Sequence, residues 1–289
     1  MKILGTGLRG LVGSRIVELL KDKYELDLSD VDITDRVLIS EKIKNSDASI
    51  VLHLAAKTDV DGCEKDKDLG VEGEAWKINV IGTKNVADAC LASNKKLIYI
   101  STDFVFDGTK DVYSEEDIPN PVNWYAKTKY EGEKIVQNLS TPWMIMRIAY
   151  PYRSSFERSD FARTILTRLQ SGRSVLAITD QIFTPTFIDD IAKALDSLIV
   201  KEATGLFHAA GGQSLSPFDA AIIIAKTFDL NQSLISKITR SEFFKDRAVR
   251  PFQLRIKNAR IEKLGIKMVG FEEGLREILK QVQDDTKKI

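Results

Sequence analysis

The N-terminal segment combines a short apolar run, a glycine-rich turn and a helical pattern, and this order constrains the fold more than any other feature. Residues 1–4 read as a strand, residues 5–13 as the glycine turn and residues 14–21 as a helix. Glycines let a backbone come close to a diphosphate, and the amides and dipole of the following helix attract its negative charge. The segment therefore predicts a dinucleotide-binding fold.

Two glycine registers fit this turn. Gly5, Gly7 and Gly10 match the common dinucleotide fingerprint, whereas Gly7, Gly10 and Gly13 match a variant spacing used by reductases. We favour the second register, because it leaves Gly5 in the strand and puts the other three glycines in the turn. The residues expected to contact the cofactor here are Gly7, Arg9, Gly10, Leu11, Val12 and Gly13.

Residues expected near the adenosine end of the cofactor give opposing indications. Asp27 lies about twenty residues past the glycines, at the expected end of a second strand, where a carboxylate holds the ribose hydroxyls and favours NADH. Arg9 would instead meet a 2′-phosphate. We therefore expect either NADPH or NADH to serve as cofactor. Asp32, followed by Ile33, is either an acceptor at the adenine edge or an N-cap for the next helix.

Short apolar runs alternate with helical patterns, which indicates parallel βαβ construction. The expected strands are Lys2–Leu4, Glu25–Asp27, Ile50–Leu54, Leu97–Ile100, Trp143–Ile148 and Val175–Ile178. The expected helices are Ser14–Lys21, Asp35–Lys44, Glu74–Ala92 and Asn123–Asn138. The pattern predicts an α/β fold with a Rossmann-like, doubly wound parallel sheet.

A change of pattern near residue 151 predicts a second domain. Residues 1–150 are expected to form the dinucleotide-binding domain, with residues 180–200 returning to it. Residues 151–179 and 201–289 lack the parallel-strand rhythm and are expected to form a smaller, mostly helical α/β substrate domain.

Ligands of such sheets lie beyond the carboxyl ends of the strands, so the residues there are candidates for the site. Leu54, Ala55 and Ala56 end the third strand, where small residues let a dinucleotide pass close to the backbone, although tight strand ends also favour alanine. Ser101 and Thr102 follow the fourth strand. Thr102 is expected to bond a substrate carbonyl, although such hydroxyl pairs also serve as turn or cap devices.

Tyr125 and Lys129 are four residues apart on an expected helix, so they share one face. A free phenol has a pKa near ~10 and is a poor proton donor or acceptor at neutral pH until a neighbouring cation favours the phenolate. Lys129 is placed to be that cation. With Thr102, the pair predicts a site that transfers a proton to a carbonyl.

Composition excludes several other functions. Lysine plus arginine equals aspartate plus glutamate at 42 each, so no net field favours nucleic acid. No apolar run approaches the ~18 residues of a membrane span, and we expect a cytoplasmic protein that binds no membrane. Cys63, Cys90, His53 and His208 lack the spacing of metal ligands, so no metal is expected.

Four segments give the chain a resemblance to a known family. They are Ser101-Thr102-Asp103-Phe104-Val105-Phe106-Asp107-Gly108, Asn123-Trp124-Tyr125-Ala126-Lys127-Thr128-Lys129 with Gly132-Glu133, Asp180-Gln181-Ile182-Phe183-Thr184-Pro185-Thr186, and Arg250-Pro251. The chain resembles the extended short-chain dehydrogenases/reductases and, within them, the dTDP-4-dehydrorhamnose reductases. The third segment is the most particular to the rhamnose reductases, and the resemblance runs from Met1 to about Gln283.

The resemblance implies NAD(P)H-dependent reduction of the C4 keto group of a nucleotide-linked 6-deoxy sugar, namely dTDP-4-dehydro-L-rhamnose. Tyr125 would protonate the C4 oxygen, Lys129 would lower the pKa of Tyr125 and hold the nicotinamide ribose, and Thr102 would orient the carbonyl. Asn79 matches a residue near the cofactor, and it is equally suited to cap a helix.

The resemblance also implies a sugar-binding set, Thr58, Val60, Thr102, Phe104 and Tyr150. Arg250 would reach toward the substrate diphosphate, or it is a surface residue before a proline turn. The chain has Tyr150 near the place where rhamnose reductases commonly have tryptophan, and it has His53-Leu54-Ala55-Ala56 in place of the usual Asn-Ala-Ala. These departures weaken the substrate assignment more than the reaction assignment.

Two alternatives stay open. The chain would be a nucleotide-sugar epimerase or dehydratase, or a non-catalytic, NADP-binding regulatory subunit like that of methionine adenosyltransferase. The latter has no need of a proton donor, so Thr102, Tyr125 and Lys129 together disfavour it. The sequence does not decide whether the chain forms a homodimer.

Overall fold

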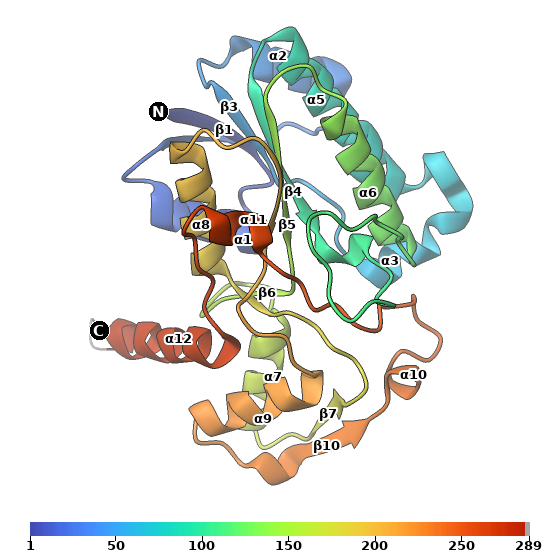
Figure 1. The fold of residues 1–289 in the computed structure, drawn as a ribbon, viewed down its shortest axis with the longest axis vertical. Helices are drawn as coiled ribbons and strands as arrows, with labels where there is room; N and C mark the ends of the chain where they lie inside the picture. The colour runs from blue at the N-terminus through green and yellow to red at the C-terminus, as the bar shows by residue number, and fades with distance from the viewer. Residues whose placement is uncertain (287–289) are drawn as a thin grey trace.

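The centre of the molecule is a parallel sheet of six strands (Figure 1). The computed structural model describes residues 1–286, with side chains to residue 283. The strands are β1 (Lys2–Thr6), β2 (Glu25–Ser29), β3 (Ile50–His53), β4 (Lys96–Thr102), β5 (Trp143–Ile148) and β9 (Gly205–Ala209), in the order β2-β1-β3-β4-β5-β9. The predicted Rossmann-like, doubly wound α/β fold is confirmed.

Helices cover both faces of this sheet, which explains why its strands are almost continuously apolar. Helices α1 (Leu11–Leu20) and α8 (Ile188–Val200) pack together on one face. The other face is covered by α2 (Arg36–Asn45), α5 (Thr83–Ala92) and α6 (Trp124–Gln137). All four residues of β3 are buried, as expected for a central strand.

Helix α6 begins where it does because Asn123 caps it. The side-chain Oδ1 of Asn123 accepts a hydrogen bond from the amide of Ala126 at 2.9 Å, which satisfies one of the free amides of the first turn. The Nδ2 of Asn123 donates to the Val249 carbonyl at 2.9 Å, so the same residue ties the start of α6 to the C-terminal part of the chain.

Between β3 and α5 the chain makes a helical excursion. It passes through α3 (Val60–Lys65), a 3₁₀ segment at Lys67–Glu72, α4 (Glu74–Trp76) and a π-helical turn at Lys77–Gly82 that runs into α5. The helix predicted at Glu74–Ala92 is therefore present, and the π turn widens it around Asn79. Such π turns often mark functional sites.

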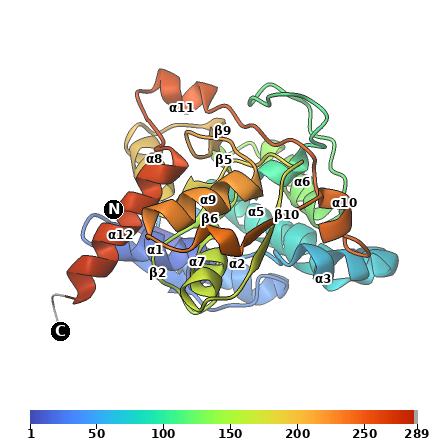
Figure 2. The same ribbon diagram turned by 90° about the horizontal axis from the view of Figure 1, so that it is seen from below.

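The lower lobe in Figure 1 contains two small sheets and several helices. β6 (Pro151–Tyr152) pairs with β8 (Thr186–Phe187), and β7 (Val175–Ile178) pairs with β10 (Ile235–Ile238). Its helices are α7 (Phe161–Gln170), α9 (Pro217–Thr227), α10 (Arg240–Phe243) and α12 (Phe271–Thr286), whereas α11 (Ala259–Lys263) packs beside β9 of the main sheet. Viewed from below in Figure 2, α9 and β10 lie in front of the parallel sheet.

Two strands are placed differently from the sequence-based expectation. Val175–Ile178 is a strand, but it lies in the lower lobe beside β10 and not in the main sheet. The sixth strand of the main sheet is Gly205–Ala209, from a segment that we expected in the second domain. The chain returns to the sheet through α8, which packs on α1, and β9 then adds beside β5. The proposed division into two domains remains a prediction.

We predict that Gly132→Ala destabilises the fold by moving α6 away from β4. A Cβ at Gly132 would lie 2.5 Å from the Tyr99 hydroxyl and 3.0 Å from the Asn79 carbonyl oxygen. Overpacking of this kind costs about 1–3 kcal/mol in the free energy of unfolding, measurable by urea denaturation. Gln137→Ala, at an exposed position of the same helix, is the control. Equal stability of the two variants would contradict the close approach.

Candidate active site

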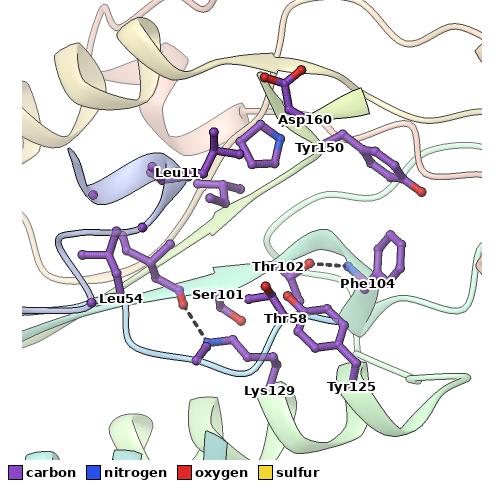
Figure 3. A pocket seen from close by; sticks show the side chains of 18 of the residues that line it. Leu11, Leu54, Thr58, Ser101, Thr102, Phe104, Tyr125, Lys129, Tyr150 and Asp160 are labelled. Carbon is purple, nitrogen blue, oxygen red and sulfur yellow. Dashed lines mark hydrogen bonds between the residues drawn. The ribbon is translucent and has the colours of Figure 1, made fainter. Parts of the chain in front are cut away.

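A cavity of about 780 Å³ opens at the carboxyl ends of β1, β3, β4 and β5 (Figure 3). Among the predicted residues, its lining includes Gly7, Gly10, Leu11, Val12, Gly13, Leu54, Ala55, Ala56, Thr58, Val60, Thr102, Phe104, Tyr125, Lys129 and Tyr150. The structure thus brings the glycine turn, the strand ends and the Tyr–Lys helix to one place. The roles of these residues remain predictions.

The glycine turn forms one wall of the cavity. Gly7 has φ +70°, and a Cβ there would come within 2.4 Å of the Ala55 nitrogen. Gly13 packs against the chain at Leu8, where a Cβ would lie 2.5 Å from Leu8 Cα. Gly10 is the N-cap of α1 and supplies no side chain to its first turn, so the amides there are open to an anion. This wall has the features of a diphosphate site.

The adenosine end differs from the prediction for Asp27. Asp27 lies in the middle of β2, opposite Leu4 in the register, and its carboxylate accepts from Lys42 Nζ at 3.0 and 3.1 Å. The strand was expected to end at Asp27, but β2 continues to Ser29, and the cofactor role of Asp27 remains a prediction. Asp30 follows the strand, and the Arg9 guanidinium binds its carboxylate through Nε and Nη2 at 2.7 and 2.8 Å. Both side chains of this pair are exposed.

The other predicted adenosine residues have local roles. Asp32 accepts from the amide and the hydroxyl of Thr34, both at 2.8 Å, and the N-cap of α2 is Asp35. Ile33 is buried and packs against Gly82, where a Cβ would lie 2.6 Å from Ile33 Cδ1. Neither Asp32 nor Ile33 is among the residues that line the cavity.

Asn79 supports the site from the π turn. Its Oδ1 accepts from the Lys57 amide at 2.8 Å, and its Nδ2 donates to the Lys57 carbonyl at 3.0 Å and to the Thr128 hydroxyl at 2.9 Å. Asn79 is fully buried and is not an N-cap. It therefore joins the loop after β3 to helix α6, next to the Tyr–Lys face.

Thr102, Tyr125 and Lys129 converge at the bottom of the cavity (Figure 3). The Thr102 hydroxyl lies close enough to Tyr125 to lower the pKa of its phenol, and it accepts a hydrogen bond from the Phe104 amide at 3.2 Å. Lys129 Nζ donates to the Ile100 carbonyl at 2.9 Å and lies 4.0 Å from the centre of the Tyr99 ring. The ammonium is thus held at the carboxyl end of β4, one helical turn from the phenol.

Burial controls the charges at this site. It raises the pKa of Tyr125, opposed by the hydrogen bond from Thr102. It lowers the pKa of Lys129 to about 7, opposed by the charge of Glu133. It also raises the pKa of Asp103 to about 7. An amine and a carboxyl that both titrate near neutral pH are typical of sites that move protons.

The residues predicted to bind the sugar line the same cavity. Tyr150 follows β5 with a left-handed backbone, φ 36°, a conformation that costs a non-glycine residue about 1–3 kcal/mol. Its ring contacts Phe104 at 5.6 Å and Phe183 at 4.8 Å between ring centres. Thr58 and Val60 line the opposite side. The strained backbone therefore directs an aromatic ring into the cavity (Figure 3).

The cavity has further lining residues that were not predicted, among them Ser101, Asp103, Phe156, Arg158, Ser159, Asp160 and Phe161. The sequence did offer a signal for Asp103, because this residue directly follows a buried strand in the Ser101-Thr102-Asp103 segment. The residues from 156 to 161 belong to the connection into α7, which carries no recognisable motif. Only the fold brings that connection over the glycine turn.

Arg250 does not line this cavity. It is buried, with 7% of its surface exposed, and its Nη1 donates to Asp61 on α3 and to the Ala248 carbonyl. Its guanidinium lies 4.9 Å from the Phe244 ring centre. Arg247 binds the other oxygen of Asp61 at 2.6 Å. Arg250 thus connects the C-terminal part of the chain to α3, and its role at the substrate diphosphate remains a prediction.

Comparison with known proteins places the chain in a family. A model of the family described as the RmlD substrate binding domain matches residues 1–284. The chain belongs to this family. It is therefore also a member of the extended short-chain dehydrogenases/reductases, as the sequence motifs implied.

Curated relatives include a reductase and a subunit of a methionine adenosyltransferase. The chain is 33% identical over 260 residues to the dTDP-4-dehydrorhamnose reductase of Aggregatibacter actinomycetemcomitans, covering 84% of this chain and 86% of that protein. It is 31% identical over 297 residues to the methionine adenosyltransferase 2 subunit beta of Bos taurus, covering 96% of this chain and 87% of that protein.

Solved structures give the same family. A dTDP-4-dehydrorhamnose reductase from Clostridium acetobutylicum matches with a TM-score of 0.89 and 32% identity over 98% of this chain and all of the other. The enzyme from Bacillus anthracis, solved in complex with NADP, matches with a TM-score of 0.89 and 29% identity over 97% of this chain and 99% of the other. Within residues 1–286, no helix has the length and apolar character needed to cross a bilayer.

We predict that Asp61→Asn lowers the free energy of unfolding by about 1–3 kcal/mol near pH 7, because it leaves two arginines without their carboxylate. The two arginines, Arg250 above all, hold the pKa of Asp61 well below its usual range. The stabilisation is therefore present above about pH 4 and is lost as pH falls below it.

Asp59→Asn is the matched control, since Asp59 is an exposed carboxylate two residues away that makes no side-chain cap bond. Thermal unfolding of both variants from pH 3 to pH 7 gives the comparison. If the two variants have the same Tm near pH 7, Asp61 does not join the lobes.

Proposed function

We propose that this chain is an NAD(P)H-dependent reductase of the C4 keto group of a nucleotide-linked 6-deoxy sugar, with dTDP-4-dehydro-L-rhamnose as the expected substrate. The observation that carries the proposal is the convergence of Thr102, Tyr125 and Lys129 in a cavity that also includes the glycine turn. A hydride acceptor bound between these two walls would have a phenol, a hydroxyl and an ammonium around its carbonyl.

The dinucleotide site fits the residues present. Gly7 and Ala55 leave room for close approach of a diphosphate, and the open amides at the start of α1 are its expected partners. When bound, NAD(P)H supplies the hydride. Lys129, whose ammonium is held at the end of β4, is placed to hold the ribose hydroxyls beside the nicotinamide.

Tyr125 is the proposed proton donor to the carbonyl oxygen. Burial raises the pKa of its phenol, so it holds its proton at neutral pH. Thr102 lies beside the phenol, and its hydroxyl is held by the Phe104 amide, which donates to it at 3.2 Å, and by Asp103, to which it donates at 3.2 Å. A positioned donor of this kind contributes about 10²- to 10⁴-fold in rate.

A second cavity, of about 550 Å³, is the proposed site for the nucleoside. It shares Tyr150 and Phe161 with the first cavity, so the two are neighbours. Its walls include the rings of Phe183, Phe243 and Phe244, and they also include the side chain of Arg168. Aromatic faces with a cation nearby suit a planar base joined to a diphosphate.

A second candidate function is that of a dinucleotide-binding regulatory subunit. Its support is the similarity to the methionine adenosyltransferase 2 subunit beta along almost the whole chain. The third candidate, a nucleotide-sugar epimerase or dehydratase, has support from the shared fold of such enzymes. A panel of nucleotide keto-sugars with NADPH and NADH, followed by nicotinamide absorbance, separates these functions.

A reductase consumes one equivalent of reduced cofactor for each keto-sugar. A regulatory subunit binds the cofactor and consumes none. An epimerase or dehydratase recycles its cofactor, so it shows no net loss of absorbance and keeps dinucleotide bound through purification. Absence of net NAD(P)H oxidation with every keto-sugar would contradict the proposed reaction.

We predict that Tyr125→Phe lowers kcat by about 10²- to 10⁴-fold, because it removes the proton donor. The Kd for NADPH should stay near the wild-type value, since the phenol is not part of the diphosphate wall. Steady-state kinetics and fluorescence titration measure the two quantities. Tyr130→Phe, on the same helix and outside the cavity, is the control. Unchanged turnover in Tyr125→Phe would remove Tyr125 from the proposed role.

We predict that the Arg9–Asp30 pair sets the cofactor preference. Asp30→Ala frees the Arg9 guanidinium for a 2′-phosphate and should lower the Kd for NADPH relative to NADH, whereas Arg9→Ala should raise it. Asp27→Ala, which removes the mid-strand carboxylate, should leave the ratio of the two Kd values unchanged. A larger effect from Asp27 than from Asp30 would reverse this assignment.

A further inference from the structure

Asp103 is a buried carboxyl whose hydrogen-bonding capacity is only half used. It lines the cavity and is only 2% exposed. Its Oδ1 accepts from the Thr102 hydroxyl at 3.2 Å, whereas its Oδ2 is buried and makes no hydrogen bond. An ionised carboxylate normally accepts several hydrogen bonds, and leaving one oxygen bare inside a protein is costly. The surroundings of Asp103 therefore suit a carboxylic acid better than a carboxylate.

The groups that face Asp103 carry little charge that would oppose a proton there. Tyr125 on α6 and Tyr150 after β5 both have a pKa raised by burial, so both stay neutral near pH 7. Lys129 and Arg158 are the cationic side chains that line this cavity, and burial lowers the pKa of Lys129 to about 7. Burial is the main cause of the raised pKa of Asp103, and it is opposed only by hydrogen bonds from Thr102 and from backbone amides.

Thr102 lies between this carboxyl and the proposed proton donor. Its hydroxyl donates to Asp103 Oδ1 at 3.2 Å and lies beside the Tyr125 phenol in the cavity (Figure 3). A hydroxyl has one proton and can accept a second hydrogen bond, so it passes protons between two neighbours. When Asp103 is protonated it can donate to Thr102, which leaves the Thr102 proton directed at Tyr125.

We propose that Asp103 is the proton store of the active site and returns a proton to Tyr125 through the Thr102 hydroxyl after each reduction. This inference rests on the proposed reductase function. In the reduction, the carbonyl carbon gains a hydride from NAD(P)H, and the carbonyl oxygen gains the Tyr125 proton. The phenolate then takes the Thr102 proton while Thr102 takes the Asp103 proton. Asp103 is left as a carboxylate and regains a proton from solvent when the product leaves.

Asp103 acts through Thr102, so its loss should spare the first turnover. In Asp103→Asn, Tyr125 still carries its own proton, and the rate of the first hydride transfer should stay within about threefold of wild type. Later turnovers must wait for a proton from solvent, and kcat should fall about 10²-fold. Stopped-flow mixing of the variant and NADPH with the keto-sugar should therefore show a burst of one equivalent of NADPH oxidation, followed by a slow steady state.

Asp107→Asn is the control for this experiment. Asp107 lies in the same segment, outside the cavity, and its carboxylate accepts from the Tyr113 hydroxyl and the Thr109 amide. Its loss perturbs the loop and should give no burst. The proposal that Asp103 stores a proton is overturned if Asp103→Asn lowers the first-turnover rate and kcat equally, or lowers neither. Failure of the wild-type protein to oxidise NAD(P)H with any keto-sugar contradicts the reductase function instead.

A stability measurement tests the proton on Asp103 without substrate. The folded protein raises the pKa of Asp103 from 3.8 to about 7, so this group favours the folded state at low pH and loses that contribution as pH rises toward 7. Between pH 4.5 and pH 7.5, the Tm of Asp103→Asn should therefore rise relative to the Tm of the wild-type protein. A difference that is constant with pH overturns the inference, because Asp103 would then hold no proton near neutrality.

If Asp103→Asn does not fold, Thr102→Val supplies the second test. It removes the hydroxyl that connects the store to Tyr125 and keeps the carboxyl in place. Wild-type enzyme should show one phase of NADPH loss. Thr102→Val should slow the first turnover, because Thr102 also contacts the carbonyl, but it should lower kcat further than the first-turnover rate and so show two phases, with Thr102→Ser returning to one phase. Thr102→Val and Thr102→Ser with the same single phase would overturn the relay.

Discussion

The parallel register of the sheet is the constraint on which the site depends. Because β1, β3, β4 and β5 run in the same direction, their ends at Thr6, His53, Thr102 and Ile148 lie along one edge. Each strand is followed there by residues of the cavity, and helix α6 delivers the phenol and the ammonium to the same edge. The order β2-β1-β3 turns the chain in opposite directions on the two sides of β1, which opens the crevice above the glycine turn.

Burying ionisable groups at this edge costs free energy, and only a few polar contacts offset that cost. Lys129 is almost fully buried, with one carbonyl and one aromatic face for its ammonium. Asp103 has a single hydroxyl and two backbone amides. Burial of this kind moves the pKa of each group toward neutrality, in opposite directions, because it disfavours the charged form of both. The same burial that weakens stability gives the site an acid and an amine that exchange protons near neutral pH.

Motifs with a local physical cause could be predicted from the sequence, whereas features set by tertiary packing could not. The glycine turn and the Tyr125–Lys129 face follow from backbone geometry, and the structure brings both to one cavity. The end of the second strand could not be predicted, because it is not encoded locally, and β2 extends to Ser29 before Asp30 binds Arg9. The ion pair of Arg250 could not be predicted either, because its partner, Asp61, is far away in the sequence. The sequence analysis missed Gly205–Ala209 as a strand of the main sheet, because a short apolar run does not indicate which strand it pairs with.

The relatives of this chain include a dTDP-4-dehydrorhamnose reductase and a methionine adenosyltransferase 2 subunit beta, so direct hydride transfer is the property that distinguishes the proposed reductase from a protein that only binds the cofactor. The decisive measurement uses NADPH that carries deuterium at the transferable position of nicotinamide C4, incubated with the protein and dTDP-4-dehydro-L-rhamnose. The account predicts a reduced sugar with one deuterium bound to its C4 carbon, seen by NMR and mass spectrometry. A sugar recovered without deuterium, with the labelled NADPH intact, would contradict it.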